Sequence, residues 1–164
     1  METAEFITYY TSPIGNILIA GSDSAITKVL FCEEAGEGSA SIPTVLQQCI
    51  SQLDQYFAGK SKEFNLPLQP SGTTFQQQVW QQLSTIPFGS TVSYLDVARA
   101  ISGEKAIRAV GAANGRNPIC LIVPCHRVIG SDGSLTGYAG GLWRKEWLLH
   151  HEGVLKPAAQ LTLF

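Results

Sequence analysis

The stretch Val123-Pro124-Cys125-His126-Arg127-Val128-Ile129 breaks a β-branched apolar run at a proline and places one cysteine beside one histidine. Proline fixes its own φ angle and disfavours the helical region for the residue before it. We therefore expect Cys125 at the exit of a strand-like segment and outside any helix, where its thiol can meet a substrate. Only a few per cent of an ordinary cysteine is thiolate near neutral pH, so a neighbouring group such as His126 or Arg127 changes its reactivity.

A structural cysteine is the alternative at this position. Reduced cysteine is among the most buried residue types and commonly packs as a small hydrophobe. Adjacent residues of a strand also point to opposite faces, so the side chains of Cys125 and His126 need not touch. The interpretation of Cys125 as a nucleophile therefore depends on the rest of the chain.

The composition is typical of a protein that folds in the cytoplasm. The chain has 164 residues, enough for one ordinary domain or two small ones, and no apolar run approaches the ~20 residues of a spanning helix. Its first residues are acidic, whereas a secretory signal carries basic residues there. The cysteines show no CxxC pair, which predicts reduced thiols at Cys32, Cys49, Cys120 and Cys125.

Charge is distributed unevenly along the chain. The net charge of −2 argues weakly against a nucleic-acid partner. Up to Ser71, however, three basic residues stand against eight acidic ones, whereas from Gly72 onward eight basic residues stand against five acidic ones. Such a split between the two halves is one indication of a segment that meets nucleic acid.

The first half predicts an antiparallel meander followed by one helix. Turn-forming clusters separate three β-rich segments, Phe6–Tyr10, Asn16–Ala20 and Ile26–Phe31. Apolar side chains then recur at helical spacing over Pro43–Phe57. A run with two prolines and a glycine, residues 66–72, follows this helix. We place a boundary there and predict domains 1–72 and 73–164.

The second half predicts helices, two of which form a helix-turn-helix. The expected helices run from Thr73 or Thr74 to about Leu83, over Tyr94–Ile101, over Glu104–Asn114 and over Leu142–His151. Ser93 is the expected N-cap of the second helix, and Gly153 the C-cap glycine of the last. Two tryptophans of the last helix, Trp143 and Trp147, are expected in the core.

Several motifs occur in one order along this second half. They are Ser93-Tyr94, Arg108-Ala109-Val110-Gly111-Ala112, Asn117-Pro118, Pro124-Cys125-His126-Arg127-Val128, Gly137-Tyr138-Ala139-Gly140-Gly141 and Lys145-Glu146-Trp147-Leu148-Leu149-His150-His151-Glu152. In this order they resemble the O6-alkylguanine-DNA alkyltransferases, also called methylated-DNA–protein-cysteine methyltransferases. The resemblance covers about Thr74 to Gly153, and its Pro-Cys-His-Arg core is highly specific.

The resemblance implies direct, irreversible DNA repair. A member of this family takes an alkyl group from O6 of guanine, and more weakly from O4 of thymine, onto its own cysteine, here Cys125. A thiolate can displace a methyl carbon in line from an aryl oxygen, provided that the thiol is deprotonated and the departing oxygen is stabilised. Because the thioether product is a poor leaving group, such a protein acts once, as a suicide enzyme, and needs no cofactor.

The resemblance also implies the residues around the cysteine. The family's histidine, here His126, deprotonates the cysteine through a bridging water, and its glutamate, here Glu152, orients that histidine. Asn117 matches the asparagine that ties the helix-turn-helix to the cysteine segment by hydrogen bonds to the backbone. Together with Cys125, these residues are the expected catalytic set.

Four further positions match DNA and base contacts. Tyr94 matches the tyrosine that donates to guanine N3, and Arg108 matches the finger that replaces the flipped base in the stack. The carbonyl of Val128 and the N–H of Ala139 match groups that hold the flipped guanine; some relatives have serine instead of Ala139, but the backbone donor survives that change. The implied partner is double-stranded DNA with alkylated bases, bound in the minor groove by a monomer, with cooperative binding left open.

The implied fold class is α+β. It combines an N-terminal ribonuclease H-like α/β domain that has a small antiparallel sheet with a mainly helical C-terminal domain that contains the helix-turn-helix. Some relatives hold a structural zinc in the N-terminal half, but here that half has only Cys32 and Cys49 and no histidine. Since four ligands are lacking, we predict no zinc or other metal.

Three other interpretations compete with this one. A Cys–His hydrolase would attack an acyl carbon with the same thiolate, but it leaves Arg108 and the helix-turn-helix unexplained. An alkyltransferase-like sensor binds alkylated guanine without reacting, but such proteins have tryptophan where this chain has Cys125. A metal site would need ligands whose spacing matches no zinc pattern: Cys120, Cys125, His126, His150 and His151.

Overall fold

The computed structural model describes residues 4–155, which form two compact units. The first unit takes the chain up to Thr73 together with Pro118–Ile122, and the second takes Thr74–Asn117 and the chain from Val123 onward. A single boundary after residue 72 does not describe this division, because a later segment returns to the first unit. None of the helices within the described range is both long and apolar enough to cross a membrane.

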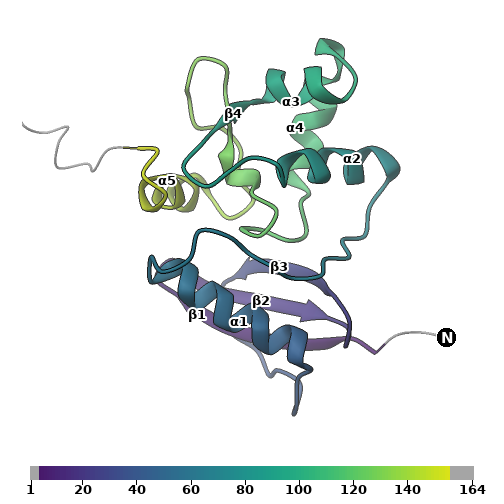
Figure 1. Cartoon of the computed structure of the whole chain (residues 1–164), viewed down its shortest axis with the longest axis vertical. Helices are drawn as coiled ribbons and strands as arrows, with labels where there is room; N and C mark the ends of the chain where they lie inside the picture. Colours follow the sequence, from purple (N-terminus) through teal and green to yellow (C-terminus); the bar gives the residue numbers. More distant parts are fainter. Residues whose placement is uncertain (1–3, 156–164) are drawn as a thin grey trace, which may run out of the picture. The chain divides into compact units, whose positions relative to one another are not determined.

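The first unit is an antiparallel sheet with one helix along a face (Figure 1). Its elements are β1 (Phe6–Ser12), β2 (Gly15–Gly21), β3 (Ile26–Cys32) and α1 (Thr44–Phe57). The strand order is β1-β2-β3, so consecutive strands pair, as the turn clusters predicted. Alternate strand residues such as Ile17 and Ile19 and the helix residues Leu46, Cys49 and Leu53 are at most 1% exposed and form the core. The predicted meander and helix are confirmed.

Two segments from elsewhere in the first unit pair with the outer edge of β3. The carbonyl of Pro118 accepts from Val29 N–H and the carbonyl of Val29 accepts from Cys120 N–H, both at 2.8 Å. Ile26 makes the same kind of exchange with the segment around Leu68. These bonds cover an edge that would otherwise present unpaired backbone groups.

The second unit is mainly helical. It contains α2 (Thr74–Leu83), α3 (Tyr94–Ile101), α4 (Ile107–Gly115), α5 (Leu142–His151) and a short parallel pair, β4 (Val92–Ser93) with β5 (Val128–Ile129). The sequence did not predict this strand pair, because two residues are too few for a periodic pattern.

Capping explains where the helix-turn-helix was predicted well and where it was not. Ser93 Oγ accepts from Asp96 N–H (3.0 Å) and Asp96 Oδ2 accepts from Ser93 N–H (2.9 Å), so α3 begins where predicted. The next helix was expected from Glu104, but residues 104–106 form a 3₁₀ turn and α4 begins at Ile107. Gly103 has no side chain that could cap the first turn, so the first hydrogen bonds tighten to 3₁₀ spacing.

Candidate active site

Cys125 begins a one-turn 3₁₀ helix, Cys125–Arg127, that leads directly into β5. The prediction of a strand-like segment before it was wrong, because the chain turns there instead. The N–H of Cys125 donates to the Val123 carbonyl (2.8 Å) and the N–H of Arg127 donates to the Pro124 carbonyl (3.0 Å). These local bonds satisfy backbone groups that a strand would have paired with a neighbour. Cys125 is only 3% exposed, so its thiol is buried and not presented at a strand end.

Two buried asparagines bind the cysteine segment, Asn114 in α4 and Asn117 shortly after that helix. Asn117 Nδ2 donates to the carbonyl of Val123 (2.8 Å), which is the kind of backbone contact that the family resemblance implied. Asn114 Nδ2 donates to the carbonyl of Cys125 (3.4 Å). Asn114 was not predicted as a site residue, although a polar side chain one turn before Asn117 in an otherwise small-residue helix could have indicated it. The cysteine is therefore held on both sides through its backbone.

Glu152 lies at the centre of a buried charge cluster next to the cysteine. Its Oε2 accepts from His126 Nε2 at 2.7 Å, and Arg127 donates to both of its oxygens, from Nε at 2.8 Å and from Nη2 at 3.1 Å. Arg127 also donates from Nη1 to the carbonyl of Ile86 (2.7 Å) and lies over the ring of Phe88. Arg127, the cation next to the Cys125–His126 pair in sequence, is thus bound to Glu152.

Electrostatics keep His126 in the state that a general base requires. Its side chain is fully buried, and this burial is the main cause that lowers its pKa below the usual value. Glu152 opposes the shift, while the positive charges of Arg127 and Lys145 add to it. Because the carboxylate accepts from Nε2, Nδ1 keeps its lone pair, and Nδ1 is buried with no hydrogen-bond partner among the described residues.

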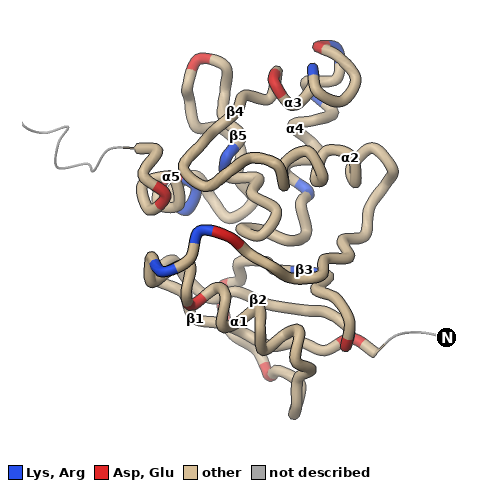
Figure 2. The backbone as a smooth tube through the Cα atoms, in the orientation of Figure 1, with Lys and Arg blue, Asp and Glu red and all other residues tan. Residues whose placement is uncertain are grey.

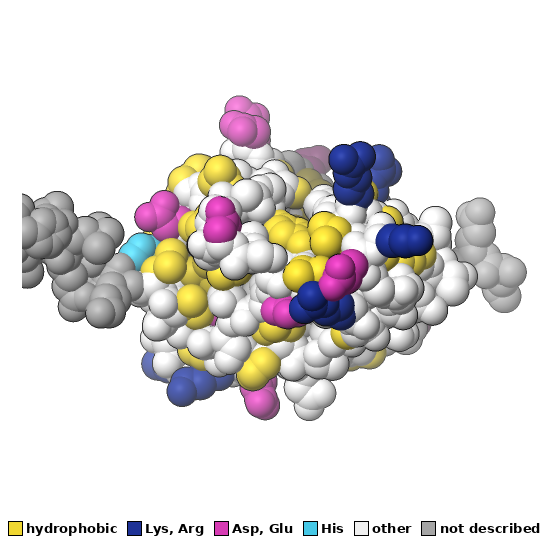
Figure 3. Space-filling view, turned by 90° about the horizontal axis from the view of Figure 1, so that it is seen from above, with side chains coloured by type: hydrophobic (Ala, Val, Ile, Leu, Met, Phe, Trp, Pro, Cys, Tyr) yellow, Lys and Arg dark blue, Asp and Glu magenta, His cyan; other side chains and the backbone are white. Residues whose placement is uncertain are grey.

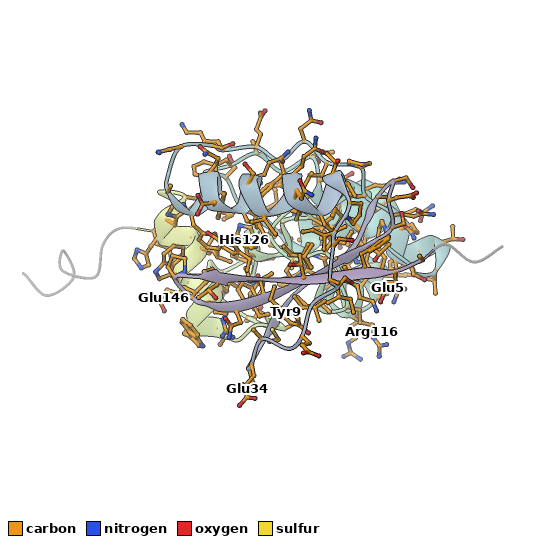
Figure 4. All side chains as sticks on the ribbon, turned by 90° about the horizontal axis from the view of Figure 1, so that it is seen from below. Glu5, Tyr9, Glu34, Arg116, His126 and Glu146 are labelled. Atoms are coloured by element: carbon orange, nitrogen blue, oxygen red, sulfur yellow. The ribbon has the colours of Figure 1, made fainter. Side chains whose placement is uncertain are left out.

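Lys145 occupies the same site, although no role was predicted for it from the sequence. The residue is 0% exposed, and its Nζ donates to the carbonyls of Val128 (2.6 Å) and Thr136 (2.8 Å). Burial lowers the pKa of Lys145 to about 8, and negative charge on Cys125 opposes that shift. Its neighbour Glu146 points outward from α5, while His126 lies among packed side chains (Figure 4). A signal was available, because Lys145 stands one and two turns before the buried residues Leu148 and Glu152.

A hollow of ≈ 450 Å³ lies in the same unit and has mostly apolar walls. Its lining is Tyr94, Ile107, Gly111, Gly115, Thr136, Gly137, Tyr138 and Ala139. Two of the residues predicted to bind the base, Tyr94 and Ala139, are thus in its wall. The Tyr94 hydroxyl donates to the carbonyl of Thr136 (3.0 Å), the same oxygen that Lys145 holds. Cys125 is not part of the wall.

The structure gathers the predicted residues into two groups and leaves one outside. Buried in one cluster are Cys125, His126, Glu152, Asn117 and Val128. Tyr94 and Ala139 line the hollow, and Lys145 connects it to the cluster because it holds the carbonyls of both Val128 and Thr136. Arg108 is exposed on α4, the helix that supplies three residues to the wall.

One core prediction was wrong. Trp143, in the first turn of α5, is 55% exposed, and the guanidinium of Arg144 lies over its ring at 4.5 Å. Trp147 is half-buried and stacks on His151. Within residues 4–155, no three His, Cys, Asp or Glu side chains are grouped so that they could hold a metal ion.

Comparison with known families matches both halves of the chain. Residues 74–154 match the family described as "6-O-methylguanine DNA methyltransferase, DNA binding domain", and residues 6–70 match "6-O-methylguanine DNA methyltransferase, ribonuclease-like domain". The second match supports the predicted α+β class, in which the antiparallel sheet belongs to a ribonuclease-like domain.

Individual relatives are similar over nearly their whole length. The methylated-DNA–protein-cysteine methyltransferase of Mycobacterium tuberculosis is 48% identical over 157 residues, which cover 93% of this chain and 94% of that protein. The protein of the same name from Methanosarcina acetivorans is 46% identical over 155 residues, covering 90% and 98%.

Solved structures of M. tuberculosis proteins are also similar. The crystal structure of its O6-methylguanine methyltransferase has a TM-score of 0.79 at 45% identity and covers 94% of this chain and 98% of that one. The structure of OGT from the same organism in complex with DNA has a TM-score of 0.78 at 47% identity, covering 88% and 91%. The chain therefore belongs to the 6-O-methylguanine DNA methyltransferase family.

Proposed function

We propose that this protein repairs DNA by transferring the alkyl group from O6 of guanine to Sγ of its own Cys125, once per molecule. The observation that carries the proposal is the buried arrangement of Cys125, His126 and Glu152, in which His126 Nε2 is fixed on the carboxylate at 2.7 Å and Nδ1 keeps its lone pair. A nucleophile, a base and a group that orients the base are what activation of a thiol requires. O4-methylthymine is a second, weaker substrate.

The reaction follows from this arrangement. His126 takes the thiol proton on Nδ1, through a bridging water, while Glu152 stabilises the imidazolium that forms. The thiolate attacks the alkyl carbon, the S–C bond forms as the C–O6 bond breaks, and the electron pair of that bond goes to the guanine. The guanine then takes up a proton, and the thioether that remains on Cys125 has no path back. One protein is consumed for each lesion.

The hollow beside the cluster is the site that we assign to the flipped base. The carbonyl of Val128 and the N–H of Ala139 hold the edge of the guanine, and the Tyr94 hydroxyl donates to N3. To do so, Tyr94 releases the carbonyl of Thr136, which it now contacts at 3.0 Å. Thr136 keeps its bond from Lys145, so that carbonyl does not become unsatisfied when Tyr94 leaves it.

Duplex DNA with an alkylated base is the partner that we propose, approached from the minor groove by a monomer. The complex of the M. tuberculosis relative with DNA supports this partner. On the face shown in Figure 3, acidic and basic side chains lie among hydrophobic ones, so positive charge is not concentrated there. We therefore assign a specific role to exposed Arg108 on α4, which fills the gap in the stack that the flipped base leaves.

Mass spectrometry after incubation with an oligonucleotide that contains O6-methylguanine tests the proposal. We expect a gain of one methylene per molecule, located on Cys125 and not on Cys120 by fragmentation of the peptide Asn117–Arg127. Cys125→Ser is expected to bind the oligonucleotide but to gain no mass. DNA binding without any gain by the unmodified chain would indicate a damage sensor, and neither transfer nor binding would favour a hydrolase.

A comparison of substrates tests the role of Arg108. Arg108→Ala should slow transfer from duplex DNA by about 10- to 100-fold, since holding out a base is worth a few kcal/mol, but should leave transfer from O6-benzylguanine as the free base unchanged. Arg116→Ala is the matched control, because Arg116 is an exposed arginine at the other end of α4. Equal loss on both substrates would contradict the finger role.

A further inference from the structure

Lys145 is a buried lysine whose role the proposed reaction leaves open. Lysine is almost never fully buried unless its charge is paired, because desolvation of an ammonium group costs several kcal/mol. Here the side chain is 0% exposed, yet no carboxylate of the described residues lies within ion-pair distance of its Nζ. The nearby buried carboxylate, Glu152, is already engaged by His126 and Arg127.

The contacts of Nζ place its charge between the cysteine and the base hollow. It donates to the carbonyl of Val128, which follows the cysteine turn, and to the carbonyl of Thr136 in the wall of the hollow. The ring of Tyr94 lies 5.8 Å away. Carbonyl dipoles and an aromatic face stabilise a cation but do not neutralise it. The site therefore holds a positive charge that needs an anion.

Of the side chains that the structure relates to Lys145, that of Cys125 becomes an anion before the alkyl group is transferred. The titratable groups that the structure relates to Lys145 are Tyr94 from α3, whose ring lies beside Nζ, and Cys125 and His126 from the cysteine turn. The carboxylate of Glu152 is already bound by His126 and Arg127. Negative charge on Cys125 interacts favourably with Lys145, whereas the charge of Lys145 disfavours a proton on His126.

We propose that Lys145 is the counter-cation of the Cys125 thiolate, a positioning residue that stabilises the nucleophile before it attacks and holds the carbonyls of Val128 and Thr136 beside the base. The proposal deepens the proposed function and rests on it, because it concerns the cysteine that accepts the alkyl group. His126 cannot supply this charge in the resting protein, since burial keeps its imidazole neutral. Lys145 can, because its pKa of about 8 leaves most of the population charged at neutral pH.

Lys145 takes part in no covalent step. The thiol proton goes to His126, the thiolate pair forms the S–C bond, and the pair of the C–O6 bond leaves with the guanine, which later takes up a proton. Negative charge thus moves from sulfur to the departing base while the ammonium keeps its proton and both carbonyl bonds. Its contribution is to lower the pH at which Cys125 becomes a nucleophile.

Titration of the thiolate absorbance at 240 nm tests the proposal. The difference between the unmodified chain and Cys125→Ser isolates Cys125 from the other cysteines, and the same difference is measured in a Lys145→Met background. We expect Lys145→Met to move the midpoint of Cys125 to higher pH by about one unit or more, as loss of a close opposite charge does. Lys60→Met is the matched control, since Lys60 is exposed in the first unit, and it should leave the midpoint unchanged. An unchanged midpoint in folded Lys145→Met would overturn the proposal.

A second measurement needs no change at Lys145 and covers a variant that does not fold. Coupling between two charges is reciprocal, so loss of the thiolate must lower the pH at which Lys145 gives up its proton. We expect NMR of the lysine Cε resonances to show this shift for the buried lysine in Cys125→Ser, and an unchanged titration would contradict the pairing. Both titrations report on the pair even if the unmodified chain transfers no alkyl group, so failure of the proposed function is recognised separately, by mass spectrometry.

Discussion

The sheet of the first unit and the cysteine cluster of the second bury different kinds of side chain. In the described part of the first unit, the buried polar residues are two serines, Ser12 and Ser22. The second unit buries the ionisable or amide side chains of Asn114, Asn117, His126, Arg127, Lys145 and Glu152. Charged residues are also rare along the strands, where β3 alone carries one, Lys28 (Figure 2).

The comparison separates stability from chemistry. Burial of apolar side chains in the first unit stabilises the fold by about 25 cal/mol per Å² of buried surface. It requires only that neighbouring side chains are complementary in shape. In the second unit, the buried ions Arg127 and Glu152 are stable only while each keeps its partner, because desolvation otherwise outweighs attraction. A change in the sheet should therefore affect stability alone, and a change in the cluster should affect both stability and alkyl transfer.

Glu152→Gln should have the largest effect, because it removes the buried carboxylate that Arg127 and His126 share. An uncompensated buried charge costs about 3–5 kcal/mol, so the free energy of unfolding should fall by that order. The pKa of His126 loses the interaction that raises it, so the histidine becomes a weaker base and transfer slows. Urea unfolding and single-turnover transfer would measure the two effects, and an unchanged stability would contradict the charge-cluster argument.

Leu53→Ala is the counterpart in the first unit. Leu53 is 0% exposed on α1, and loss of a buried leucine side chain typically costs about 2–5 kcal/mol through lost packing and the cavity that remains. At a temperature where the variant stays folded, the transfer rate should stay within about twofold of the original, a difference below 0.5 kcal/mol. A large loss of transfer in the folded variant would show that the two units are not independent in this respect.

Lys145→Met should change how stability depends on pH. The pKa of Lys145 is about 8 in the folded protein against an ordinary value of 10.5, so between these values the unfolded chain binds more protons. The stability of the unmodified protein therefore rises with pH across this window, while that of Lys145→Met lacks this contribution. Unfolding at pH 7 and at pH 10.5 should show a relative gain for the unmodified protein of about 3 kcal/mol. If the free energies of unfolding of the two proteins changed with pH in parallel, the lowered pKa of Lys145 would be contradicted.

Ser93→Ala should have the smallest effect of the four. It removes the side-chain oxygen that accepts from Asp96 at 3.0 Å, and loss of an N-cap costs about 1 kcal/mol. The pKa of Asp96 is held low first by its bond from the Ser93 backbone N–H, so the carboxylate stays ionised and half of the capping box survives. Thermal unfolding would measure the difference beside a Ser84→Ala control, which removes a hydroxyl that donates to the Trp80 carbonyl (3.1 Å) and caps no helix N-terminus. An equal shift in both would show that the cap contributes nothing specific.

Much of the fold could be predicted because periodicity and caps act locally. The alternation of strands β1–β3 and the Ser93 cap depend on residues close in sequence, and the structure confirms them. The turn before Cys125 could not be predicted, because a proline in a β-branched run fits a strand end and a turn equally well. Its conformation depends on Asn114 of α4 and on Asn117 shortly after that helix, whose side chains bind its carbonyls.

The site was predicted as a set of residues and not as a set of contacts. The motif order identified Cys125, His126 and Glu152, but nothing local indicates that Arg127 shares the carboxylate, and only the helical spacing to Leu148 and Glu152 indicated that Lys145 is buried. Long-range packing of α5 decides both, since it brings residues more than twenty positions apart within hydrogen-bond distance. For Trp143 the error is the reverse, since this residue was predicted to be buried and is exposed. An apolar side chain on a helix is buried only where a neighbouring element covers it.

The path of the chain through Pro118–Ile122 has a consequence for dissection of the molecule. This segment leaves the second unit, pairs with β3 and returns immediately before the cysteine turn. A fragment that starts at Thr74 would contain Pro118–Ile122 but lack β3, the strand with which this segment pairs. A fragment that stops at Thr73 would leave the edge of β3 exposed. The two units are interleaved in sequence, so neither can be excised by one cut: removal of either unit also removes or strands the segment that directly precedes the reactive cysteine.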